Sequence, residues 1–165
     1  NGRTETIWEA SAPTLEDVVL FGPKLPPVLA KINLGGSLVQ FALSYLLGSD
    51  AKDLADVQEV QSAGSVSFNE QFTVLATSSE CAEALIDSDL EAIVFKALAK
   101  LKKPLVVLRW RDRIQVRLFT HTKSPADMDA MVKVGLEVAS QSARPQSERV
   151  GRQLTDAEQR IFNKA

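Results

Sequence analysis

The side chains with the most direct chemical reactivity in this chain of 165 residues are its single cysteine, Cys81, and its single histidine, His121. An imidazole that deprotonates a thiol creates a nucleophile, and Cys81 lies near the start of a predicted helix, where the helix dipole favours the thiolate. Nothing in the sequence brings His121 to Cys81, and a cysteine on an apolar helix is more often a packing residue. We therefore expect Cys81 to have no catalytic task.

The small number of histidine and cysteine residues also limits the metal and acid–base sites that this chain can form. One histidine and one cysteine are too few for a multi-histidine or Cys/His metal site, except around carboxylates. The carboxylates include no pair that the pattern marks as general acid and general base. The sequence predicts no catalytic residues, no metal and no cofactor, and we expect that the protein is not an enzyme.

The strongest functional signal is a group of arginines in the stretch VVLRWRDRIQVRLF, residues 106–119. Even positions are apolar and odd positions are mostly basic, which is typical of strands with one buried face. Because cross-strand partners share a face, we predict a hairpin at 105–119 with the three-residue loop 111–113, in which Trp110 pairs with Ile114. The odd face would then carry four arginines clear of the core: Arg109, Arg111, Arg113 and Arg117.

Charge is divided into two blocks, although the net charge is only −2. Residues 96–123 hold nine basic side chains against Asp112, and residues 50–91 hold ten acidic ones against Lys52. One interpretation is a surface for an acidic protein partner or an anionic membrane. Its candidate residues are Arg109, Arg111, Arg113, Arg117, Lys102 and Lys103. The other is that the two blocks neutralise each other in the fold, or that the arginines solvate a sheet face. No helix concentrates Arg, Asn and Gln, so we expect no sequence-specific nucleic-acid binding.

Elements that would position these residues follow from periodicity and caps. A strand is predicted at 4–10. A second apolar run at Val18–Phe21 is followed by prolines, which argue against a central strand there. The alternation at 68–76 predicts a strand with one buried face. Capping boxes that begin at Thr77 and Ser88 predict two helices, and Ser124 with Pro125 predicts a third.

An uncharged run of 18 residues, INLGGSLVQFALSYLLGS, lies between Lys31 and Asp50. Its polar and glycine residues argue against a membrane span, so we predict a buried helix from Ser37. Its buried face would consist of Leu38, Phe41, Ala42, Tyr45 and Leu46. The same helix, at 37–47, could mediate a homodimer.

These elements predict a single α+β domain at 1–140, with an antiparallel sheet that includes the hairpin at 105–119 and helices packed on one face. Residues 141–165 are polar and unpatterned at first, and we interpret them as a linker followed by a short C-terminal helix.

From Asp56 to Ala139, the strand FNEQFTV, the two helices after it, the hairpin and the helix SPADMDAMVKVGLEVA together resemble the C-terminal soluble domain of a family of uncharacterised bacterial membrane-anchored proteins. Members of that family have a pair of membrane helices ahead of this domain, and this chain has none intact. The resemblance implies a cytoplasmic domain tethered to the inner face of a membrane, and it implies no activity or cofactor.

Together, these observations favour a non-enzymatic binding or regulatory module whose basic face contacts an anionic partner. Two alternatives stay open from the sequence: a small enzyme whose site has no motif, and a structural self-association domain that uses the 37–47 helix.

Overall fold

The computed structural model describes residues 4–25, 38–54 and 56–144, and these form an α+β fold. Its elements, in chain order, are β1 (Thr6–Pro23), α2 (Leu38–Leu47), the 3-10 helix η1 (Gly48–Asp53), β2 (Gln58–Glu59), α3 (Val66–Gln71), β3 (Phe72–Ala76), α4 (Ser79–Leu85), α5 (Ser88–Leu101), β4 (Leu105–Leu118) and α6 (Pro125–Ala143). The strands form one antiparallel sheet in the order β2-β3-β1-β4.

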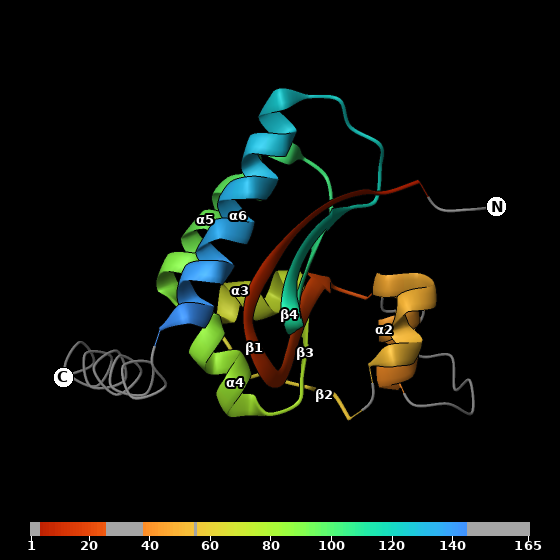
Figure 1. Cartoon of the computed structure of the whole chain (residues 1–165), viewed down its shortest axis with the longest axis vertical. Coiled ribbons are helices and arrows are strands. Elements are labelled where there is room, and N and C mark those ends of the chain that lie inside the picture. Colours follow the sequence, from red (N-terminus) through yellow and green to blue (C-terminus); the bar gives the residue numbers. More distant parts are fainter. Residues whose placement is uncertain (1–3, 26–37, 55, 145–165) are drawn as a thin grey trace.

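β1 and β4 are long strands that both bend back on themselves (Figure 1). The Asp127 carboxylate accepts hydrogen bonds from Lys103, just before β4, and from Thr122, just after it. A straight strand of 14 residues would hold its two ends more than about 40 Å apart, so β4 must double back. The segment at 105–119 therefore turns back as predicted, but both of its halves pair with β1, and no pairing between the two halves is found in the described residues.

The bend of β4 lies inside the bend of β1. The first half of β4 pairs with the second half of β1, with Leu108 opposite Leu20, and the second half of β4 pairs with the first half of β1, with Val116 opposite Trp8. β3 adds to the second half of β1, where Phe72 lies opposite Pro23. β1 is therefore central at Val18–Phe21, contrary to our expectation, because Pro23 is its last residue and the other two prolines of that segment follow it in the sequence.

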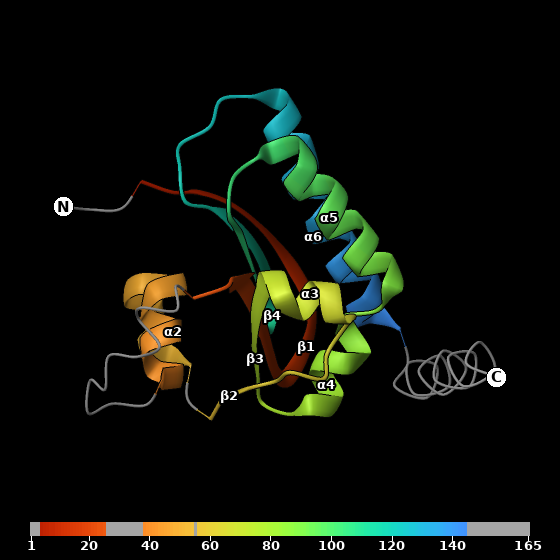
Figure 2. The same cartoon turned by 180° about the vertical axis from the view of Figure 1, so that it is seen from behind.

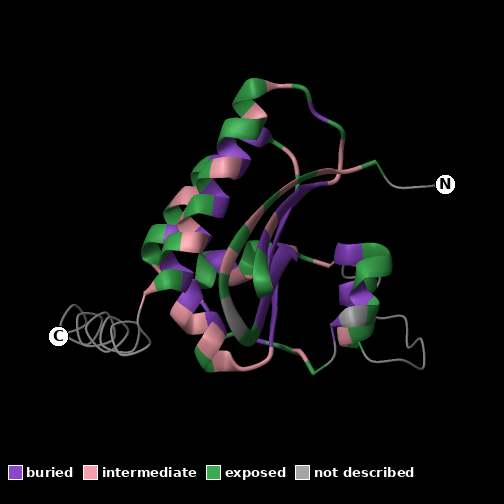
Figure 3. Cartoon of the chain, in the orientation of Figure 1, coloured by how far each residue is buried: buried purple, intermediate pink, exposed green. Residues whose placement is uncertain are grey.

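Helices lie on both sides of this sheet, as Figures 1 and 2 show. α3, α4, α5 and α6 cover one side and enclose the larger core, whereas α2 and η1 pack on the other side against Leu20, Leu75 and Val106. We predicted that all helices pack on one face of the sheet, and this prediction is wrong for α2. The strands between the two layers are buried on both faces, which Figure 3 shows as purple ribbon.

Side chains of β4 change face at its bend. Leu105 and Val107 face the larger helical layer, and Val106 and Leu108 face α2, but beyond the bend the residues that face the larger layer are the even ones: Ile114, Val116 and Leu118. Arg111 at the bend has a φ of 51°. An even face that is continuous through the loop, with Trp110 paired to Ile114, is therefore wrong.

α3 occupies the first part of the segment that we predicted as a strand. Ser65 is its N-cap and accepts a hydrogen bond from the Phe68 amide, while the Glu91 carboxylate accepts from the Ser65 amide and hydroxyl. These contacts satisfy the first turn of a helix, so the strand begins only at Phe72. All five residues of β3 are buried, so neither face is the polar one that alternation suggested.

The remaining helices match their predicted positions to within a few residues. The N-caps of α4 and α5 are Ser78 and Asp87, each one residue away from the predicted cap, and Ser124 caps α6 as predicted. α6 continues to Ala143, so the domain boundary at 140 is placed too early. The predicted terminal helix after residue 145 lies outside the described residues.

The buried face of α2 agrees with the predicted one at Ala42 and Leu46 but is rotated around the helix from it. Its buried residues are Ala42, Leu43, Leu46 and Leu47, whereas Leu38 is exposed and Phe41 and Tyr45 are half-buried. The sequence has apolar residues on most sides of this helix, so spacing alone did not select the side that contacts the sheet. Homodimer formation through the 37–47 helix stays a prediction.

Candidate functional site

The four arginines of the predicted basic face do not share a face. Arg109 and Arg117 are both only 2% exposed, and the change of face at the bend sends them to opposite sides of the sheet. The Arg109 guanidinium donates to the Ser142 hydroxyl, at 3.2 Å, and to the main-chain carbonyls of Pro13 and Arg111. The prediction of a basic face made of all four arginines is therefore wrong. Arg109 is a buried residue whose guanidinium bonds within the fold.

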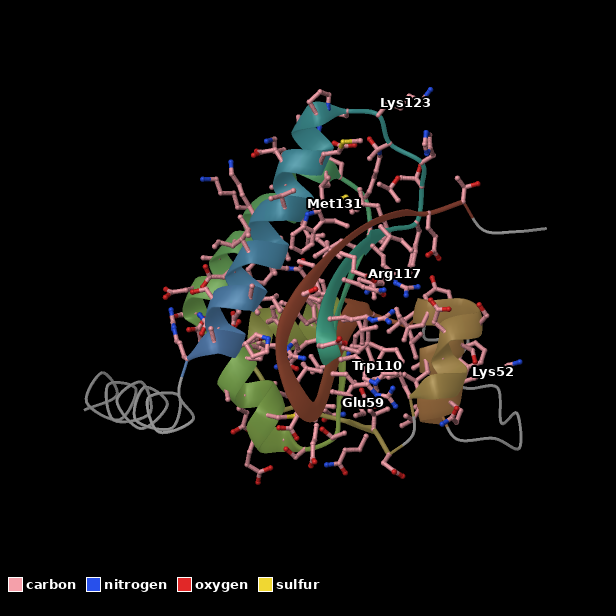
Figure 4. All side chains as sticks on the ribbon, in the orientation of Figure 1. Lys52, Glu59, Trp110, Arg117, Lys123 and Met131 are labelled. Carbon is pink, nitrogen blue, oxygen red and sulfur yellow. The ribbon has the colours of Figure 1, made fainter. Side chains whose placement is uncertain are left out.

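Arg117 lies on the α2 side of the sheet (Figure 4) and joins the two charge blocks. Its Nη2 donates to the Asp50 carboxylate at 2.7 Å, and its Nη1 lies 3.7 Å from the Glu5 carboxylate. Asp50 belongs to η1, so this ion pair fastens η1 to β4. At this contact the acidic and basic blocks do neutralise each other, which was the alternative to a binding surface.

Arg111 and Arg113 are exposed at the bend of β4. The Arg111 guanidinium carbon lies 4.9 Å from the centroid of the Trp110 ring, and Arg113 Nε lies 3.8 Å from the neighbouring Asp112 carboxylate. The bend of β1 pairs with the bend of β4 and carries the exposed residues Glu16 and Asp17. Charges of both signs are therefore present at the bend, which weakens it as an anion-binding surface.

Lys102 and Lys103, the other two candidates, line a cleft of about 270 Å³. The cleft lies where the C-terminal end of α5 meets the end of β1 and the beginnings of β3 and β4. Its other lining residues are Pro23, Gln71, Phe72, Leu98, Pro104 and Leu105. Apart from Gln71 these residues are apolar, so the cleft combines apolar residues with two lysines.

Lys102 has an unusual backbone. It is the C-cap of α5, with φ 51° and ψ 29°, in the left-handed region where helices most often place glycine. Among the residues that the structure describes, its ammonium has no hydrogen bond or ion pair, whereas the Lys103 ammonium lies 3.1 Å from the Asp127 carboxylate. Lys102 therefore has a charge available to a ligand, on a backbone that disfavours its side chain.

More lysines surround this end of α5. Lys100 and Lys133 share the Asp129 carboxylate, at 3.2 and 2.9 Å, and Lys123 lies in the exposed connection from β4 to α6 (Figure 4). We call these five residues the lysine end: Lys100, Lys102, Lys103, Lys123 and Lys133.

Two carboxylates that contact residues of the lysine end are held as anions. Hydrogen bonds from Thr122 and from Lys103 lower the pKa of Asp127 below its ordinary value. Hydrogen bonds from Lys133 and from Lys100 lower the pKa of Asp129 in the same way. Five lysines therefore stand against two carboxylates here, and the lysine end keeps a net positive charge.

The structure does not bring Cys81 and His121 together. Cys81 is in α4, where its Sγ donates to the Ser78 carbonyl at 3.1 Å, and His121 is exposed in the connection from β4 to α6. In Figure 1, α4 and that connection lie at opposite ends of the molecule. The Cys81–His121 pair is therefore not a site in this structure.

Three carboxylates also meet between α5 and α6. Oxygens of Asp87, Asp89 and Glu137 lie within 4.8 Å of one another. The buried Gln141 amide donates to Asp87 and to Glu137, and Arg144 contacts Asp87 at 3.3 Å. These donors account for the Asp87 and Glu137 carboxylates as part of a contact between the two helices.

No family model matches the chain, and neither a curated protein nor a solved structure matches it. Within the described ranges, no helix has the length and apolar character that crossing a bilayer would require.

Sequence reasoning found the lysines of the cleft but not the cleft itself. Its walls come from three separate segments, at 23, at 71–72 and at 98–105, which are joined only when the end of β1 meets β3 and β4. The one local signal was the Lys-Lys-Pro triplet at 102–104, which ends α5 and places two lysines at the start of a strand.

Proposed function

We propose that the protein is a non-enzymatic binding module that contacts an anionic membrane surface through its lysine end. The observation that carries the proposal is the gathering of five lysines, with only two carboxylates among them, where α5 ends and α6 begins. Basic residues near an anionic bilayer contribute about 1 kcal/mol each. A net charge of about three would then give weak, reversible binding that a tether could make stable.

A membrane is favoured over an acidic protein by an apolar side chain on the same surface. Met128, in the first turn of α6, is 44% exposed and lies between the paired residues Asp127 and Asp129. An exposed apolar side chain on a surface that also carries basic residues is the arrangement with which surface-bound proteins enter the headgroup region. The tether to the inner face of a bacterial membrane is implied by the resemblance of Asp56–Ala139 alone, and it is part of the proposal.

The experiment is co-sedimentation of the whole chain with vesicles of phosphatidylcholine and phosphatidylserine in equal parts. We expect binding at low salt, none to pure phosphatidylcholine, and a loss of binding as the Debye length falls below about 10 Å near 0.1 M salt. The double variant Lys102→Glu/Lys123→Glu should lose binding. The matched control Arg111→Glu/Arg113→Glu reverses the same amount of charge at the bend of β4 and should keep it.

Two results would contradict this proposal. If the arginine variant loses binding and the lysine variant keeps it, the bend of β4 is the contact surface. If the parent chain does not bind these vesicles at low salt, the lysine end does not contact a membrane. The small enzyme and the self-association domain stay hypotheses from the sequence.

A further inference from the structure

The cleft at the end of α5 has walls of two chemical kinds. Pro23, Leu98 and Pro104 give it an accessible apolar wall over the buried Phe72 and Leu105, and Lys102 and Lys103 also line it. A purely polar anion would leave the accessible apolar wall without a partner, and a purely apolar ligand would leave the Lys102 charge without one. A ligand that matches both has an apolar chain and one anionic head.

We infer that this cleft binds a single short amphipathic anion, with its apolar chain against Pro23, Leu98 and Pro104 and its carboxylate or phosphate head at Lys102. The inference goes beyond the proposed membrane contact and shares only the two lysines with it. The cleft, at about 270 Å³, is slightly smaller than typical small-molecule sites, which start at about 300 Å³. It therefore suits a single short chain rather than a whole two-chain lipid.

The backbone of Lys102 is the second observation. A left-handed conformation is unfavourable for any side chain with a Cβ and carries no penalty for glycine. Lys102 is one of three non-glycine residues with positive φ in the described part of the chain, and its ammonium has no partner there. Glycine at this C-cap would make the fold more stable, so a lysine at the margin of the cleft is explained by what its charge binds.

This arrangement predicts that stability and binding change in opposite directions in one variant. Lys102→Gly relieves the backbone and removes the charge, so its melting temperature should rise by about 2–4 °C while its affinity falls about tenfold or more. Lys102→Arg keeps both the charge and the unfavourable backbone. It should bind within about threefold of the parent chain.

The test is calorimetric titration of the whole chain with octanoate, below the concentration at which it forms micelles. Octyl phosphate is titrated in parallel, and the tighter of the two identifies the head as a carboxylate or a phosphate. Octanol has only the chain and inorganic phosphate has only the charge. Each of these two controls should bind about tenfold more weakly than the better amphiphile.

Three outcomes would overturn the inference: neither amphiphile binds, Lys102→Gly binds as tightly as the parent chain, or octanol or inorganic phosphate binds as tightly as the amphiphiles. These results are separable from the membrane experiment. A chain that binds phosphatidylserine vesicles but neither amphiphile has the membrane contact without the cleft ligand, and a chain that binds octanoate but no vesicles has the reverse.

Discussion

Gly135, in the middle of α6, is the position where adding one methyl group should have the largest effect. A Cβ built on Gly135 would lie 1.9 Å from Cζ3 of Trp8, and 2.4 and 2.5 Å from two other atoms of the same ring. Favourable carbon–carbon contacts are about 3.5–4.0 Å long. The indole or the helix would therefore have to move by roughly 1.5–2 Å, against the large core that Trp8 packs on.

The magnitude follows from two opposing effects. Glycine to alanine inside an exposed helix stabilises a protein by up to about 1 kcal/mol, whereas overpacking a filled site destabilises it by about 1–3 kcal/mol. A clash of this size belongs at the upper end, so Gly135→Ala should lower the free energy of unfolding by about 2 kcal/mol. The melting temperature should fall by about 4–8 °C.

Urea unfolding followed by circular dichroism measures this, and a second variant isolates the cause. Trp8→Ala removes the ring that Gly135 contacts. In that background, Gly135→Ala should be neutral or stabilising by up to about 1 kcal/mol, a coupling energy of about 3 kcal/mol. Gly135→Ala that stabilises the parent chain, or destabilises both backgrounds equally, would refute the close approach of α6 to β1.

Two further predictions concern charged groups. Arg117→Ala should destabilise the fold by about 2–4 kcal/mol, because it removes a buried side chain, and Asp50→Ala by about 1 kcal/mol, because the buried guanidinium keeps Glu5 and Gln115 as partners. Equal losses in urea unfolding would show that the two environments do not differ as described. The pKa values of Asp127 and Asp129 are lowered in the folded protein, so these carboxylates should stabilise the fold. The contribution should be complete at a pH above 3.8, the ordinary pKa of the carboxyl group, and should be lost as the pH falls through the lower pKa values of the folded state. Asp127→Asn/Asp129→Asn should therefore unfold less steeply in an acid titration, and an unchanged slope would contradict the assignment.

Helices were the elements that sequence reasoning predicted best. In α5, apolar residues at spacings of three and four, acidic residues in the first turn and Lys100 in the last turn all predict the same helix. In α6, Ser124 and Pro125 fix the start. These signals lie within the segment itself, so they do not depend on which elements pack against it.

The prediction of an arginine face was wrong because the direction of these side chains depends on contacts outside the segment. The run at 105–108 is apolar on both faces, so alternation does not show which side meets the larger core. One residue with positive φ, Arg111, then exchanges the two faces. In the segment 68–76, alternation predicted a strand, but Ser65 and Glu91 stabilise a helical first half, and Glu91 is 26 residues away in sequence.

The nesting of β4 within β1 has a kinetic effect as well. Thr6 pairs with Leu118, so the outermost pair of the two strands joins residues that are 112 positions apart. During synthesis at about 5–20 residues per second, β1 would wait roughly 5–20 s for its partner, with Val18–Phe21 lacking their native neighbours. Helices can form in that interval because their contacts are local. The sheet at the centre of the molecule is therefore expected to close late, and its closure to limit the rate of folding.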